Sequence, residues 1–145
     1  MLEMIKHIIM NNDLAVLATS AENKPYCSLM AYVAGDDGRK IYMLTRKDSR
    51  KFRNIKTNPK VCLMVDTRAN HNKDRAKVKA LTISGTCCPV SASDQSALLD
   101  QLLYTHPQLK TLARYRDAVV MEVAAESFLL LDGVNDAFFM DLTQA

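Results

Sequence analysis

Short apolar segments separated by polar turns recur along most of this 145-residue sequence. Such segments, bounded by Gly, Pro, Asn or Asp, are typical of β-strands. The strongest turn signal is Gly35-Asp36-Asp37-Gly38, because glycine and aspartate accept the positive φ that tight hairpin loops require. The pattern predicts a mainly β protein with a few helices, an α+β fold whose successive strands are antiparallel. The predicted strands cover residues 14–19, 26–34, 40–46, 61–66, 78–90, 118–123, 127–131 and 137–142.

Three segments have helical patterns. Apolar residues repeat at intervals of three and four within Leu2–Ile9, which predicts an amphipathic helix at the start of the chain. A short helix follows the third strand, with Asp48 as its predicted cap. Pro59 ends that helix, because the residue before a proline is disfavoured in helical geometry. A third helix is predicted over about residues 92–105.

Periodicity limits the possible arrangements of the strands but does not select one of them. The strand at 61–66 is almost continuously apolar, which predicts burial on both of its faces. The polar, basic stretch 67–77 predicts a loop, and the strand at 78–90 is expected to bend at Gly85, where a bulge is sterically easiest. A small closed barrel would remove exposed edges, and a β-sandwich fits the periodicity equally well. The length predicts a single domain over residues 1–145.

The segment Ile41–Pro59 joins an apolar strand to a short helix whose first turn is cationic. A helix start offers free N–H groups and a partial positive charge to an anion. Arg46, Arg50 and Lys51 add positive charge there and Ser49 adds a hydroxyl, an arrangement suited to a phosphate monoester. Cations on an exposed helix turn are also common as a solvated face, so the local pattern alone leaves both interpretations open.

Several short segments follow one another in a recognisable order: Lys24-Pro25-Tyr26-Cys27-Ser28-Leu29-Met30, Leu44-Thr45, Ser49-Arg50-Lys51, Asn54-Ile55, Asn58-Pro59 and Leu81-Thr82-Ile83-Ser84-Gly85-Thr86. Together they resemble the signature of the pyridoxamine 5′-phosphate oxidase-like flavin-binding split barrels, over about residues 13–133. The resemblance implies a small antiparallel split β-barrel. It also implies that flavin mononucleotide (FMN) binds between the two chains of a homodimer.

The resemblance further implies which residues contact the cofactor. Thr45, Arg50 and Lys51 match positions that contact FMN, with the two cations at its phosphate, and Arg46 and Ser49 are neighbours added on chemical grounds. The strand from Tyr26 to Met30 matches the one whose backbone lies along the flavin ring. The predicted cofactor-binding set is Tyr26, Cys27, Ser28, Leu29, Met30, Leu44, Thr45, Arg46, Ser49, Arg50 and Lys51.

The chain also departs from the founding enzyme of that family. Ser28, Val33 and, approximately, Ala80 stand where that enzyme has arginine, lysine and glutamine. The enzyme's C-terminal tryptophan and Arg-x-His, which grip the pyridoxal substrate, have no counterpart, and this chain has no tryptophan. Genuine pyridoxamine phosphate oxidation is therefore not expected, whereas flavin binding depends less on these positions.

The composition argues against several other classes of function. The 19 Lys and Arg residues against 16 Asp and Glu give a net charge of +3, too small to indicate nucleic-acid binding. The four cysteines and three histidines show no metal-ligand spacing, and no apolar run reaches the ~20 residues of a membrane span. The N-terminus lacks the features of a signal peptide, so a cytoplasmic protein with reduced thiols is expected.

Three interpretations fit the resemblance. FMN supplies its own redox chemistry, so the chain is expected to be a small oxidoreductase that takes hydride from a reduced nicotinamide, NAD(P)H. Its catalytic residues and its acceptor are not identified by the sequence. The alternative is a non-catalytic module that stores, carries or senses a flavin or a haem. A third interpretation is an interaction domain that has kept the fold without a ligand.

Overall fold

The computed structural model describes residues 1–144 and contains one curled antiparallel sheet. The strand order is β2-β1-β5-β6-β7-β4-β3, with β8 added on β7. The strands are β1 (Leu14–Ala21), β2 (Lys24–Ala31), β3 (Val33–Ala34), β4 (Lys40–Arg46), β5 (Lys60–Asp66), β6 (Lys79–Pro89), β7 (Ala118–Asp132) and β8 (Asp136–Asp141). The helices are α1 (Leu2–Met10), α2 (Arg50–Thr57), α3 (Ala92–Thr105) and α4 (Lys110–Ala113), with 3-10 turns η1 (Arg68–Asn70), η2 (Arg75–Lys77) and η3 (Pro107–Leu109).

The sheet closes into a barrel because β2 and β3 belong to one extended segment that is interrupted only at Tyr32. β2 pairs with β1, whereas β3 pairs with β4 at Ile41 and Tyr42. These two short partners stand at opposite ends of the strand order, so their covalent continuity brings the ends of the sheet together. The predicted antiparallel split barrel is therefore confirmed, and the β-sandwich is not the fold.

Alternation along the strands fills the barrel with apolar side chains. Leu63, Leu81 and Ile83 on two neighbouring central strands have no exposed surface at all. Both flanking helices contribute to the same core, because α1 packs three isoleucines into it and α2 packs Phe52 and Ile55. Complete burial of a side chain of this size contributes roughly 1.5–3 kcal/mol relative to exposure, so the inner face dominates the stability of the fold.

Tyr32, between β2 and β3, connects the barrel to two helices. Its hydroxyl donates to the Ile9 carbonyl of α1 at 2.7 Å, and its own carbonyl accepts a hydrogen bond from His106 Nε2 at 2.9 Å. Its backbone N–H donates to the Asp13 carbonyl. The side chain is 2% exposed, and burial raises the pKa of its phenol, which therefore stays protonated and able to donate.

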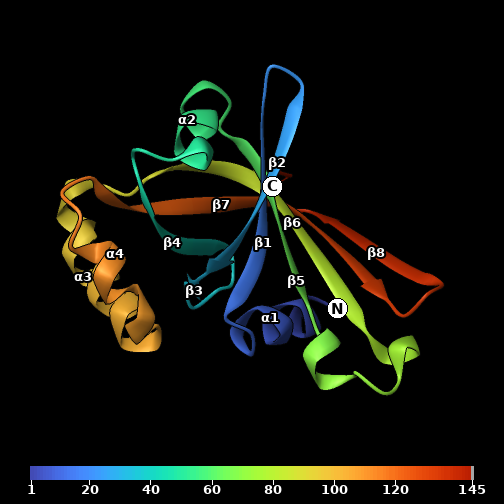
Figure 1. Cartoon of the computed structure of the whole chain (residues 1–145). Coiled ribbons are helices and arrows are strands. Elements are labelled where there is room, and N and C mark those ends of the chain that lie inside the picture. Colours follow the sequence, from blue (N-terminus) through green and yellow to red (C-terminus); the bar gives the residue numbers. More distant parts are fainter. Residues whose placement is uncertain (145) are drawn as a thin grey trace.

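Helices cover only one part of the outer surface of the barrel. Figure 1 shows α3 and α4 lying together on the side of β4, while the β7–β8 hairpin extends on the opposite side. Leu102 of α3 packs against Val33, Leu44 and Val120 on the outer side of β3, β4 and β7. Elsewhere the outer surface is open and carries exposed apolar side chains, among them Leu29 at 66% and Phe139 at 69% exposure.

The strand predictions were largely confirmed, with two corrections. The predicted burial of both faces of the fourth strand is wrong for the single chain, because Met64 of β5 is 42% exposed. The segments 118–123 and 127–131 are not separate strands but parts of β7, which pairs with β4 over Ala118–Ala124 and with β6 over Met121–Asp132. The bulge expected near Gly85 is present, as a register shift between Ser84 and Gly85.

Candidate functional site

A cavity of about 280 Å³ lies between β2 and β4, beside the first turn of α2. It gathers most of the predicted cofactor residues, although they come from segments well separated along the chain. The residues that line it are Leu29, Met30 and Ala31 of β2, Leu44, Thr45 and Arg46 of β4, Asp48, Ser49 and Lys51 around the start of α2, and Leu109 and Leu112 beyond α3.

The two strands beside this cavity each have one backbone edge without a ladder partner. Among residues 1–144, β2 pairs only with β1, and β4 beyond Tyr42 pairs only with β7. Backbone N–H and C=O groups require hydrogen-bond partners, and those of Leu29–Ala31 and Leu44–Thr45 border the cavity. They are suited to the carbonyl and imide groups of a planar ring, without any need for particular side chains.

Ser28 of β2 lies beside the lining residues of the cavity without being one of them. Its Oγ is buried and has no hydrogen-bond partner among the described residues. Alternation along β2 places Ser28 on the same face as Met30, which packs in the core of the barrel. Leaving a buried hydroxyl unpaired costs roughly 1–3 kcal/mol.

The turn from β4 to α2 depends on Ser49 rather than on Asp48. Ser49 Oγ accepts a hydrogen bond from the Phe52 N–H at 3.2 Å and donates to the Arg46 carbonyl at 2.8 Å. Asp48 instead pairs with Arg53 at 3.1 Å on the exposed surface. The prediction of Asp48 as the cap is wrong because the capping side chain belongs to the extended residue directly before the helix, which is Ser49 at φ −147° and ψ 154°.

Arg46 is held by two residues that the sequence did not indicate. Its Nε lies 2.9 Å from Asp117 Oδ1, and its guanidinium carbon lies 3.9 Å from the centre of the Tyr115 ring. Asp117 Oδ2 also accepts from the Asp48 N–H at 3.0 Å. The hydrogen bonds from Arg46 and from that N–H lower the pKa of Asp117, so the carboxylate stays ionised. Arg46 therefore fixes the β4–α2 turn, and no local pattern could signal partners about seventy residues away in the chain.

The two cations in the first turn of α2 lie in different surroundings. Lys51 is half-buried and lines the cavity between β2 and β4. Arg50 is exposed, with its guanidinium 5.4 Å from the centre of the Tyr26 ring, and these two residues line a neighbouring cavity of about 380 Å³. Adjacent helical residues point in directions about 100° apart, which accounts for the separation. Cys27 and Ser28 are not among the lining residues of either cavity.

None of the three histidines lines the cavity between β2 and β4. His106 is buried and bonded to Tyr32, and His71 lies in the loop after β5, as expected from its sequence position. Within residues 1–144 there is no group of three or more His, Cys, Asp or Glu side chains that could hold a metal ion. Over the same residues, no helix combines the length and the hydrophobicity needed to cross a membrane.

Comparison with known proteins supports one family and one fold. The family model described as pyridoxamine 5′-phosphate oxidase matches residues 1–131, and no curated protein sequence matches the chain. A haem-binding protein of Mycobacterium smegmatis superposes with a TM-score of 0.81 at 14% identity, covering 94% of this chain and 56% of that one. HutZ, the haem storage protein of Vibrio cholerae, gives a TM-score of 0.73 at 20% identity, with 90% and 93% covered. An FAD-binding protein of Mesorhizobium loti gives 0.72 at 16% identity, with 88% and 90% covered.

Proposed function

The chain belongs to the pyridoxamine 5′-phosphate oxidase family, and on that basis we propose that it binds FMN in the cavity between β2 and β4 and acts as a small flavin-dependent oxidoreductase. The observation that carries the proposal is that the cavity combines groups suited to a planar ring with a cation suited to a phosphate. Unpaired backbone edges suit a flavin ring, and Lys51 beside the start of α2 suits a phosphate. The FAD-binding relative supports a flavin as the ligand.

Each part of the site has a distinct role in this proposal. The edge of β2 at Leu29–Ala31 would hold the ring, while Thr45 and Lys51 would hold the phosphate end. The Lys51 ammonium would make a charge-assisted contact, the stronger class of hydrogen bond. FMN when bound supplies the redox chemistry, so the chain's own residues need only bind it, orient it and admit a reduced nicotinamide as donor.

A spectroscopic titration tests this function. We expect the purified protein to be yellow or to take up added FMN with micromolar or better affinity. Mixing the FMN-loaded protein with NADH or NADPH should then remove the visible absorbance of the oxidised flavin, and an added acceptor should restore it. Protein that is colourless and takes up no FMN would contradict the proposal.

A non-catalytic carrier or sensor of flavin or haem is the second candidate. One observation favours it: the haem-binding and haem storage proteins share this fold. The same nicotinamide experiment separates the candidates, because a carrier would leave the flavin absorbance unchanged. Titration with haem in place of FMN would then show which ligand is carried.

We also propose a homodimer, formed through the apolar outer surface that no helix of residues 1–144 covers. Large contiguous apolar patches are rare on monomers and mark interaction sites. Leu29 belongs both to this surface and to the lining of the cavity, so a second chain seated there would complete a wall of the flavin site. The exposed apolar residues of this surface lie on β1, β2, β5, β7 and β8 and are Leu14, Leu29, Met64, Leu129, Leu131 and Phe139.

Leu129→Lys is expected to convert the dimer to a monomer, because Leu129 lies on β7 between Thr82 and Phe139 within this surface. Burying a lysine there without a partner would be strongly unfavourable. Light scattering should give twice 16.2 kDa for the natural chain and 16.2 kDa for the variant. Tyr104→Lys is the control, since Tyr104 is 89% exposed on α3 and its replacement should leave the dimer intact. A mass of 16.2 kDa for the natural chain would contradict the dimer.

A further inference from the structure

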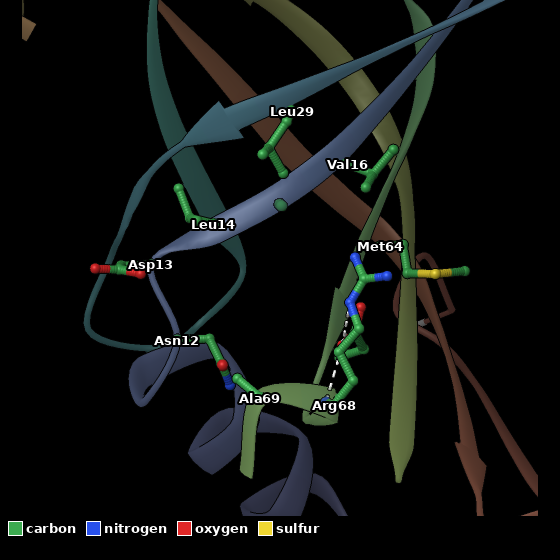
Figure 2. A pocket seen from close by; sticks show the side chains of 10 residues that line it. Asn12, Asp13, Leu14, Val16, Leu29, Met64, Arg68 and Ala69 are labelled. Atoms are coloured by element: carbon green, nitrogen blue, oxygen red, sulfur yellow. Dashed lines mark hydrogen bonds and ion pairs between the residues drawn. The ribbon is translucent and has the colours of Figure 1, made fainter. Parts of the chain in front are cut away.

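A second cavity, of about 240 Å³, shares Leu29 with the flavin cavity. Its apolar floor consists of Leu14 and Val16 of β1, Leu29 of β2 and Met64 of β5. Figure 2 shows these side chains and the polar residues at the two rims of the cavity. Those polar residues are Asn12 and Asp13 before β1, Asp66 at the end of β5 and Arg68 in η1.

Arg68 is oriented over this floor by Asp66. Its Nε lies 3.2 Å from Asp66 Oδ1, and its backbone N–H donates to the same oxygen at 3.0 Å. Figure 2 shows the guanidinium reaching from η1 toward Val16 and Met64. The Asp66 side chain is 15% exposed and the Arg68 side chain 66%, and Nη1 and Nη2 have no partner within residues 1–144. The cavity therefore presents two parallel guanidinium donors, the geometry that matches a carboxylate.

The opposite rim carries acceptors. Asn12 Nδ2 donates to the Ile8 carbonyl at 2.8 Å, which leaves the amide oxygen of Asn12 as an acceptor. The Asp13 carboxylate is exposed on the same rim. An anionic group would be repelled by Asp13, so the negative end of a ligand belongs at Arg68. An N–H or O–H donor belongs at Asn12 and Asp13.

The cavity of about 240 Å³ and its apolar floor suit a ligand of one ring. We propose that it binds a small aromatic carboxylate with an N–H or O–H donor at the far end of the ring.

The test uses the full chain without cofactor and the probe 4-aminobenzoate, with 4-aminobenzamide as its uncharged analogue. With methionine methyl groups labelled with ¹³C, 4-aminobenzoate should shift the Met64 signal, whereas FMN should shift the Met30 signal in the other cavity. Calorimetry should show that Arg68→Gln weakens 4-aminobenzoate about 10- to 100-fold and leaves the binding of 4-aminobenzamide unchanged. Arg75→Gln, on the exposed η2 turn and outside the cavity, is the matched control and should change neither affinity.

Three results would overturn the inference: no shift of Met64 at millimolar 4-aminobenzoate, equal losses of both ligands in Arg68→Gln, or an equal loss in Arg75→Gln. A shift of Met64 that disappears with Arg68→Gln supports it even if FMN does not bind, and the flavin proposal alone then fails. Uptake of FMN without any shift of the Met64 signal by 4-aminobenzoate would support the flavin proposal and contradict the aromatic carboxylate site. The cavity opens on the surface proposed for the homodimer, so a bound ligand would be enclosed by the second chain.

Discussion

Gly85→Ala is expected to lower the free energy of unfolding by about 3 kcal/mol, the upper end of the usual cost of an overpacked core. A Cβ atom at this bulge would overlap the Ala124 carbonyl oxygen and lie 3.0 Å from the Ala124 carbonyl carbon. It would also lie 3.2 Å from Ala125 Cα. These are backbone atoms of β7, which is paired on both sides, so they cannot move aside without disturbing the ladders to β4 and β6.

Urea unfolding of the two alanine variants Gly85→Ala and Gly35→Ala would check this expectation. Gly35 is the matched control, because a Cβ there would meet nothing nearer than 3.7 Å and its φ lies outside the positive range that disfavours alanine. The midpoint should fall steeply for Gly85→Ala and remain near the natural value for Gly35→Ala. Similar midpoints for the two variants would show that β6 and β7 can separate at the bulge more easily than the structure indicates.

Lys51→Ala is expected to weaken FMN binding by about one to two decades and to leave riboflavin binding nearly unchanged. A hydrogen bond to a charged group contributes about 1.5–3 kcal/mol, and riboflavin lacks the phosphate that would receive it. The folding of the cofactor-free chain should change little, because Lys51 sits in the first turn of α2, where the helix dipole disfavours a cation.

Fluorescence titration of both ligands against Lys51→Ala and Arg50→Ala would measure this difference. Arg50→Ala should have the smaller effect on FMN, because the Arg50 guanidinium lies over Tyr26 and lines the neighbouring cavity. Equal losses of FMN and riboflavin in Lys51→Ala would mean that the site had collapsed. Unchanged affinity for both ligands would place the phosphate elsewhere and leave Lys51 as a solvated cation. A thermal melt of the ligand-free variants is the control for folding.

The strands and the family signature could be predicted from the sequence because both depend on local patterns. The third strand was predicted with the bounds that β4 has, since Gly38 and the polar residues around it end the hairpin clearly. The position of the bulge was equally accessible, because only glycine tolerates the close approach of β7 at residue 85. The family resemblance, and not periodicity, predicted that Leu29, Thr45 and Lys51 lie together.

The remaining features depend on contacts that no local pattern contains. Asp117 reaches Arg46 across 71 positions, and a lone aspartate before a strand has no distinguishing signature. The choice between Asp48 and Ser49 as the cap depends on which residue takes the extended conformation, and both side chains are good caps. The open face of β5 could not be recognised from the sequence. An apolar strand has the same sequence pattern whether its outer side is covered by its own chain or by another chain.

The hydrogen bonds of Tyr32 have a consequence for how the molecule folds and unfolds. An isolated helix as short as the nine residues of α1 is marginal in water, yet α1 is joined through the Tyr32 hydroxyl to the strand segment that closes the barrel. The Tyr32 carbonyl holds His106 at the end of α3 in the same way. Opening of either helix would expose hydrogen-bonding groups at a residue that is 2% exposed, so both helices should belong to the same cooperative unit as the barrel. Deletion of the first ten residues should therefore destabilise the far end of α3, although more than ninety positions separate the two.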